Sequence, residues 1–287
     1  MSRSFIVGTG KGYRLGDIAN ETMVASREEG LLPDEAELAP QLDALAEAIA
    51  REGHTVYRPP ICPVVPDQTC PRDAGFSLGC DRIYMGRSGI ATRVEEGLCL
   101  APLVREAGLE PIHFDGMLDG GDLIHESLVL SPDDAENAIL VGMNERSSPA
   151  GLSALESSLP SPSSCRLVRV SHTRLHLDCA LTLARNEGGE LLALTLSGSG
   201  LGRLPYRHKT FEDDGSMASN LLWLDSTRFV TRENALDSDL TRYLLDTCEK
   251  RAIALPFSAL PQLGGSVRCA TLPLSLGATP RPTRLSF

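Results

Sequence analysis

The sequence predicts an α/β domain built from five similar units, each of two strands, a helix and a further strand, set in a ring. Short apolar runs and helical stretches recur in that order with a period of roughly fifty to sixty residues, as in a chain of repeated supersecondary units. The composition agrees, because 26 glycines and 19 prolines among 287 residues, with 5% aromatic residues, suit short strands and tight turns. A ring brings residues that are distant in sequence to one axial opening.

The first unit is predicted from the N-terminal sixty residues. Residues 4–8 (SFIVG) form an apolar run typical of a strand. Residues 34–52 carry Leu and Ala at helical spacing behind an acidic first turn, and Gly53 ends this helix. The segment 54–58 (HTVYR) then reads as the closing strand of the unit.

The same order recurs along the rest of the chain. The second unit is predicted from apolar runs near 75–78 and 82–86, a helix near 92–107 and a strand near 110–114. The third has runs near 122–130 and 138–142, a helix near 148–158 and a strand near 165–170. Runs near 179–195 and 219–231 precede a helix near 236–250. The Ser- and Pro-rich stretch 157–165 is predicted to be a surface loop.

Charge and apolar patterning exclude two classes of partner. The formal net charge of -11 argues against nucleic acid, because phosphate binding needs clustered Lys and Arg. It mildly favours a cationic small molecule, although an acidic surface that only aids solubility explains it equally well. The N-terminus lacks the features of a signal peptide, and no stretch approaches the ~20 apolar residues of a membrane span. We therefore expect a soluble, cytoplasmic protein; a homo-oligomer remains open.

The eight cysteines are spread along the chain without a C-x-x-C pair or the density of a disulfide scaffold. Most are expected to be buried, reduced thiols. Cys269 is the candidate for chemistry, since Gly264 and Gly265 allow a tight turn just before it and a strand is predicted to begin there. The alternative is that Cys269 is a structural thiol of the core, as free cysteines commonly are.

The segment 176–178 (HLD) contains a histidine that could act as the general base for this thiol. If this segment is a strand, His176 and Asp178 lie at i and i+2 and project from the same face. A surface ion pair is the simpler interpretation. A metal site that also includes His172 is another, but zinc sites prefer more His or Cys ligands than the segment offers. His172 is otherwise expected in an exposed loop.

Two further segments carry carboxylates between turn-forming residues. In LDGGDLI, Asp119 and Asp122 flank two glycines, and a carboxylate here could orient an imidazole, as in Cys-His catalysis with a third group. In PDQTCPRDAGF, Asp67 and Asp73 precede a predicted strand. A turn that needs Asp and Gly explains the first segment without any function.

Taken together, these motifs resemble a known family. An RD (Arg72-Asp73), a DGGD, an HLD and a GG-x-x-x-C occur in the order found in the guanidine-modifying superfamily of arginine deiminases, dimethylarginine dimethylaminohydrolases and amidinotransferases. The segments 87–96 (RSGIATRVEE) and 141–151 (VGMNERSSPAG) are also similar to family motifs. The resemblance implies a single catalytic domain over residues 1–287, folded as a pentein, a five-bladed pseudo-symmetric α/β propeller of ββαβ units around a central substrate channel.

The resemblance also implies roles for particular residues, without metal or cofactor. Cys269 is expected to be the nucleophile, His176 the general acid and base, and Asp119 the residue that orients His176. Asp73 and Asp178, with Asp67 nearby, are expected to bind the guanidinium, because two carboxylates can hold a planar cation by forked hydrogen bonds. Arg146 and Arg93 match positions that meet the substrate's α-carboxylate.

Within the superfamily, the motifs favour a deiminase-type hydrolase acting on arginine or an arginine derivative through a covalent amidino-cysteine. The pairs Arg72-Asp73 and Arg268-Cys269 and the HLD segment resemble deiminases, whereas the chain length and the segment 141–151 resemble dimethylarginine hydrolases. Amidinotransferases usually carry DAAD in place of DGGD and are the alternative reaction type. A departure is that Leu263 and Gly264 stand where deiminases usually have an Arg before the glycines. Outside the enzymes, the alternative is a silent binder of basic amino acids.

Overall fold

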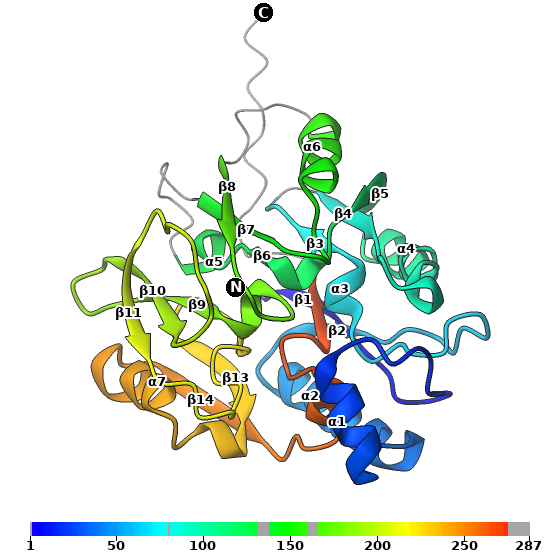
Figure 1. Cartoon of the computed structure of the whole chain (residues 1–287), viewed down its shortest axis with the longest axis horizontal. Helices are drawn as coiled ribbons and strands as arrows, with labels where there is room; N and C mark the ends of the chain where they lie inside the picture. Colours follow the sequence, from blue (N-terminus) through cyan, green and yellow to red (C-terminus); the bar gives the residue numbers. More distant parts are fainter. Residues whose placement is uncertain (1, 80, 131–137, 160–165, 275–287) are drawn as a thin grey trace, which may run out of the picture.

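Five small sheets arranged around a centre form the protein (Figure 1). The computed structural model describes residues 2–79, 81–130, 138–159 and 166–274. Each sheet has three strands, of which the middle strand pairs antiparallel with the first and parallel with the third. The predicted ring of five units is confirmed.

The first blade closes the ring, because it combines the two ends of the described chain. β15 (Thr271–Pro273) pairs antiparallel with β1 (Ser4–Val7), and β1 pairs parallel with β2 (Thr55–Tyr57). α2 (Glu35–Arg51) connects β1 to β2. Since β15 follows Cys269 by two residues, closure of the ring carries this cysteine to the centre.

α2 forms where the spacing of Leu predicts it. Asp34 caps the helix and forms a capping box with Glu37. Leu38, Leu42, Leu45 and Ile49 lie on one face and are fully buried against the first and fifth blades. Burial of this stripe fixes the blade against its neighbours.

The second and third blades also follow the predicted order. The second contains β3 (Phe76–Ser77), β4 (Arg82–Arg87), α4 (Glu96–Glu106) and β5 (Glu110–Met117). The third contains β6 (Leu123–Ile124), α5 (Ser127–Leu130), β7 (Ala138–Met143), α6 (Pro149–Ser158) and β8 (Arg166–Ser171). The predicted loop at 157–165 lies for the most part outside the described residues.

The fourth and fifth blades differ from the prediction. The fourth has β9 (Leu181–Arg185), β10 (Leu191–Leu196) and β11 (Arg207–Phe211), and residues 197–206 connect the last two strands without a helix. The fifth has β12 (Leu222–Trp223), β13 (Arg228–Arg232), α7 (Asp239–Arg242), a π-helical turn (Tyr243–Thr247) and β14 (Arg251–Leu255). The runs predicted at 179–195 and 219–231 therefore belong to two blades.

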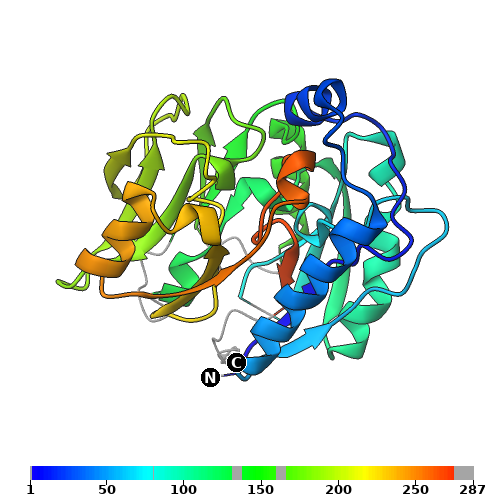
Figure 2. The same cartoon turned by 90° about the horizontal axis from the view of Figure 1, so that it is seen from below.

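Short helices outside the repeat were not predicted. α1 (Glu21–Glu29) buries only Met23 and Ser26, so it has little amphipathic signal. It begins at the N-cap Asn20, whose amide also donates to the Leu263 carbonyl, and so lies beside the turn η6 (Leu260–Leu263) (Figure 2). α1 thereby comes to the same end of the ring as the residues preceding Cys269.

None of the helices in the described part of the chain has both the length and the apolar character needed to cross a bilayer. Cys62, in the loop before α3 (Pro71–Ala74), forms a disulfide with Cys99 of α4, so these two are exceptions to the expectation that most cysteines are reduced thiols. Four described cysteines are free, namely Cys70, Cys179, Cys248 and Cys269.

Candidate active site

Cys269 lies at the centre of the ring, in the turn that leads into β15. The residue is 3% exposed, and its Sγ lines a cavity. The Asn220 side-chain amide donates to this sulfur at 3.3 Å, while the Cys269 backbone N–H donates to Asn220 Oδ1 at 3.4 Å. Burial, with the charges of Asp178 and Asp73, raises the pKa of the Cys269 thiol. In the free protein Cys269 is therefore a thiol, held by a neighbouring amide.

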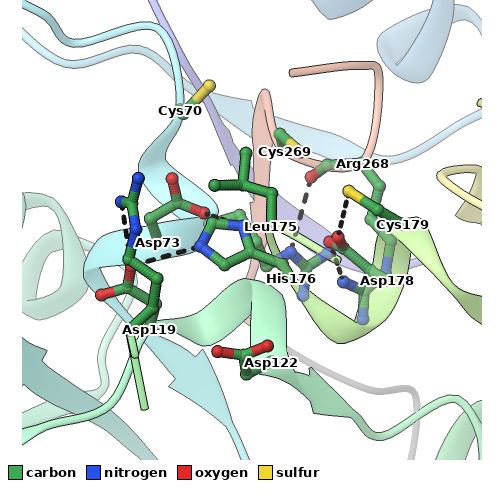
Figure 3. Close-up of polar contacts among 12 residues, drawn as sticks. Cys70, Asp73, Asp119, Asp122, Leu175, His176, Asp178, Cys179, Arg268 and Cys269 are labelled. Atoms are coloured by element: carbon green, nitrogen blue, oxygen red, sulfur yellow. Dashed lines mark hydrogen bonds and ion pairs between the residues drawn. The ribbon is translucent and has the colours of Figure 1, made fainter. Parts of the chain in front are cut away.

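His176 lies in the same cavity between two carboxylates (Figure 3). Its Nε2 is 3.2 Å from Asp119 Oδ2, and its Nδ1 is 3.6 Å from Asp73 Oδ1. Burial alone would lower the pKa of His176, but the charge of Asp73 and the hydrogen bond to Asp119 raise it to about 10. The group is accordingly an imidazolium at neutral pH, and the expected pairing of Asp119 with His176 is present.

The DGGD segment forms a 3₁₀ turn (Gly120–Asp122) that brings these groups together. A side chain at position 121 would place its Cβ 2.6 Å from His176 Nδ1, so only glycine allows the imidazole to approach. Asp122 accepts a hydrogen bond from the Leu177 backbone N–H at 2.8 Å and another from Ser147 Oγ at 2.5 Å. Asp122 thus ties the His176 segment to the turn that carries Asp119.

Asp73 is oriented by an ion-pair chain. Arg93 Nη1 donates to Asp73 Oδ2 at 2.8 Å, and the Nε and Nη2 of Arg93 donate to the two oxygens of Glu96 at 2.6 and 2.8 Å. Although burial works against it, His176 and Arg93 lower the pKa of Asp73. Burial raises the pKa of Glu96 to about 8 against the effect of Arg93. Asp73 is therefore an anion with one oxygen facing His176.

The structure gives Arg93 other partners than the expected substrate carboxylate. Besides Asp73 and Glu96, its Nη2 donates to the Cys70 carbonyl at 3.2 Å. Arg146 lines the cavity too, but its Nη2 donates to the Ala19 carbonyl, and its Nη1 is 3.8 Å from Asp119 Oδ2. Both expected carboxylate ligands thus have partners within the protein, namely carboxylates and backbone carbonyls.

Asp67 and the N-terminal segment complete the cavity. Asp67 Oδ1 accepts hydrogen bonds from the backbone N–H and the hydroxyl of Thr69, and Asp67 lines the cavity. Tyr13, Asp17 and Asn20 of the N-terminal segment also line it. The enclosed space is about 50 Å³, well below the ~300 Å³ of small ligand pockets.

Asp178 departs from the prediction. Leu177–Cys179 is a 3₁₀ turn and not a strand, so residues 176 and 178 do not alternate as strand positions do. Asp178 is fully buried and its Oδ2 accepts from Arg268 Nη1 at 2.6 Å, on the side of His176 away from Asp73 in Figure 3. Among the described residues that line the cavity, Asp178 is absent. Its carboxylate is bound to Arg268 in place of a guanidinium ligand.

His172 is also buried, so the prediction that it lies in an exposed loop is wrong. Its Nε2 lies 3.0 Å from Asp122 Oδ1, the same oxygen that accepts from Leu177. Within the described ranges, no group of three or more His, Cys, Asp or Glu side chains is placed to hold a metal ion. His172 thus lies against Asp122 in the protein interior.

Two residues of the site carried no usable signal in the sequence. Asn220 comes from the segment before β12 in the fifth blade, and nothing in its neighbours marks it as a partner of Cys269. Glu96 belongs to a segment that resembles the family, but only the structure shows its two hydrogen bonds to Arg93. Asn220 and Cys269 are close only in the folded ring, whereas Arg93 and Glu96 are three residues apart in the chain.

Comparisons with known proteins agree with this architecture. No protein-family model matches the chain. The N-terminal domain of ArgZ, an arginine dihydrolase from cyanobacteria, superposes with a TM-score of 0.75 at 16% identity, covering 96% of this chain and 98% of that chain. DDAH from Pseudomonas aeruginosa, in complex with citrulline, gives 0.68 at 16% identity, with 95% and 99% covered. This is the pentein fold.

Other penteins and one sequence relative extend the comparison. The inosamine-phosphate amidinotransferase StrB1 from Streptomyces griseus has a TM-score of 0.74 and 17% identity, covering 98% of this chain and 95% of that chain. The uncharacterized protein YkgA of Bacillus subtilis (strain 168) is 22% identical over 91% of this chain and 87% of its own length. The pentein fold accounts for the five blades and for a site at their common centre.

Proposed function

We propose that this protein is a cysteine-dependent hydrolase that acts on the guanidino group of arginine or an arginine derivative. The observation that carries the proposal is the joint placement of Cys269, His176 and Asp73 in one buried cavity, with Asp119 bound to His176. The similarity of the fold to ArgZ and DDAH supports this reaction class.

Asp73 and Asp67 suit a planar cation, because carboxylates accept the N–H groups along the edge of a guanidinium. A bound cation also stabilises the Cys269 thiolate, as does the imidazolium of His176. Asn220 adds a hydrogen bond to the sulfur. The substrate itself therefore activates the nucleophile, which in the free protein is protonated.

In the first half of the reaction the thiolate of Cys269 forms a C–S bond to the guanidinium carbon. His176 gives its proton to the departing nitrogen, and the C–N bond breaks to release the amine or ammonia. A positively charged amidino group remains on the sulfur. Asp119 stabilises the imidazolium and holds its orientation by accepting from Nε2.

In the second half, His176 is a neutral base. It removes a proton from a water molecule that attacks the amidino carbon. The C–S bond of this adduct then breaks with its electron pair going to sulfur, and the hydroxyl proton of the adduct protonates the thiolate as the ureido group forms. The product is a ureido compound. Transfer of the amidino group to an amine would replace this water, and the similarity to StrB1 makes transfer the second candidate.

The test is to incubate the protein with arginine, agmatine and methylated arginines, with and without an added primary amine, and to identify the products by mass. We expect a ureido product from an unmethylated guanidine. Cys269→Ser should abolish turnover without unfolding the protein, because an alcohol is a poor nucleophile without a strong base. A guanidinylated amine would identify a transferase. Binding of the compounds without any product would identify a silent binder.

A further inference from the structure

One disulfide joins two segments of the second blade that both reach the active-site cavity. Cys62 begins the segment 62–70, which carries Asp67, and Cys99 lies near the start of α4. The two cysteines are 37 positions apart in the chain, so the bond closes a loop that includes Asp73. The reaction proposed above makes no use of this bond.

The segment 62–70 is attached to the start of α4 at both of its ends. At its first residue the attachment is the disulfide. At its last residue, the Cys70 carbonyl accepts a hydrogen bond from Arg93 Nη2 at 3.2 Å, and Arg93 is bound in turn to Glu96 in the first turn of α4. Asp67 lies between the two attachments and lines the active-site cavity. The disulfide is therefore one of two attachments that fix this carboxylate relative to α4.

Gln68 connects the disulfide end of the segment to Asp67. Its Oε1 accepts a hydrogen bond from the Cys62 backbone N–H at 2.8 Å, and its Nε2 donates to the Pro60 carbonyl at 3.0 Å. Gln68 follows Asp67 directly in the chain. A displacement of Cys62 is therefore passed through these two hydrogen bonds to the residue beside the Asp67 carboxylate.

The disulfide lies close to the active-site cavity and is accessible from outside. A small cavity is lined by both Cys99 and Cys70, and Cys70 also lines the active-site cavity. Cys62 and Cys99 are each partly exposed. The apolar side chains of Val64 and Leu98 beside them are 70% and 58% exposed, so a reagent can approach the bond. Exposed disulfides are typically the labile and regulatory ones.

We propose that the Cys62–Cys99 disulfide is a redox site that sets how tightly the active site binds its substrate, and that dithiols are the class of reagent that acts on it. The inference rests on the proposed function for the substrate, a cationic guanidine that Asp67 and Asp73 bind. A thiolate of the dithiol attacks one sulfur of the disulfide, and the other protein sulfur leaves with the electron pair and takes up a proton. The second thiol of the reagent then displaces the first protein sulfur in the same way. The protein gains two electrons and two protons, and the reagent becomes a disulfide.

Reduction is expected to weaken substrate binding with little effect on the chemical step. Without the bond, the segment 62–70 keeps only its attachment to α4 at Cys70, so Asp67 is held less well in place. We expect dithiothreitol to raise the KM for arginine by about threefold to tenfold, the effect of one hydrogen bond. The kcat should change little, because Cys269 and His176 lie on other segments. A merely structural role would lower kcat through loss of folded protein and leave KM unchanged.

The matching variant is Cys62→Ser/Cys99→Ser, which should have the KM of the reduced protein and should not respond to dithiothreitol. Cys248→Ala is the control, since it removes a buried free thiol of the fifth blade and keeps the disulfide. It should respond to dithiothreitol as the unmodified protein does. Oxidised glutathione should restore the lower KM, and alkylation of quenched samples followed by peptide mass spectrometry reports the state of both cysteines.

Amide hydrogen exchange gives a readout that does not need turnover. Faster exchange in residues 63–69, both on reduction and in the double variant, supports the proposal. If the double variant keeps the KM and the exchange rates of the oxidised protein, or if dithiothreitol changes its KM as well, the proposal is wrong. If the oxidised protein turns over no guanidine, the proposed function fails. Exchange and a calorimetric titration of arginine, with and without dithiothreitol, then still decide whether the disulfide controls this segment and its ligand.

Discussion

Cys269 and His176 are both protonated in the free protein, and the proposed reaction requires that one of these two protons leaves. In the free protein the sulfur is a thiol and the imidazole is charged, because burial opposes the thiolate while Asp73 and Asp119 favour the imidazolium. Loss of one proton gives either a thiolate with an imidazolium or a thiol with a neutral imidazole. Either form can start the reaction, so the population of this singly deprotonated pair controls the rate at low substrate concentration.

We expect kcat/KM to rise with pH across the neutral range, by about tenfold per pH unit, and to level off near the His176 pKa of about 10. The sign follows from the proton that has to leave: below this pKa the fraction of competent enzyme grows as pH increases. Asp119→Asn removes a negative charge that favours the imidazolium, so the rising limb should move to lower pH. A profile of kcat/KM from pH 6 to 10 for both proteins checks this, and a flat profile would contradict it.

The sequence predicted part of the candidate site but not all of its partners. Cys269, His176, Asp73 and Asp67 line one cavity and Asp119 lies against His176, while the roles of these residues stay predictions. Asn220 could not be assigned, since nothing in its neighbours marks it until the ring brings it beside Cys269. Glu96 lies three residues from Arg93, but that spacing alone does not distinguish a buried ion pair from an exposed one. Asp178 was misplaced by an assumed strand.

Among the secondary-structure elements, α2 is one that the local sequence pattern predicted correctly. Its acidic first turn and Leu spacing predicted a helix over 34–52, and the helix spans Glu35–Arg51. The fourth blade shows the opposite case, since a connection of residues 197–206 replaces its helix and two blades were merged in the prediction. A blade that lacks its helix still has its three strands, but it is shorter than the repeat length, so the repeat does not reveal it in the sequence.

The N-cap of α2 gives a test at this scale. Asp34→Ala removes the side-chain acceptor for the Glu37 N–H, and we expect the free energy of unfolding to fall by about 1 kcal/mol. Asp34→Ser, which keeps a cap, is the matched control and should cost less. Urea denaturation followed by circular dichroism measures both. Equal losses for the two variants would mean that the cap does not stabilise the helix.

Across the whole molecule, one buried ion network joins three of the five blades. Arg268 precedes the closing strand of the first blade, and it donates to Glu126 of the third blade at 2.9 Å and to Asp178 of the fourth at 2.6 Å. Its Nη2 also donates to the Leu123 carbonyl. Because Arg268 is the neighbour of Cys269 in sequence, this network holds Cys269 in register with the segment that carries His176 and Asp178.

The network separates two roles for Asp178. If its carboxylate serves Arg268, Asp178→Asn leaves a buried guanidinium with only Glu126 as a charged partner, and the free energy of unfolding should fall by about 3 kcal/mol. If instead it grips the guanidinium of the substrate, as the family resemblance implied, the same variant should keep its stability and lose its preference for arginine over asymmetric dimethylarginine. We expect the first outcome, since the carboxylate is fully buried and bound at 2.6 Å.

Urea denaturation midpoints and kcat/KM for both substrates distinguish the two roles, and Asp246→Asn at an exposed position is the control. If the Asp178→Asn variant is stable but has an altered substrate preference, Asp178 binds the substrate, and Glu126 is sufficient as the charged partner of Arg268.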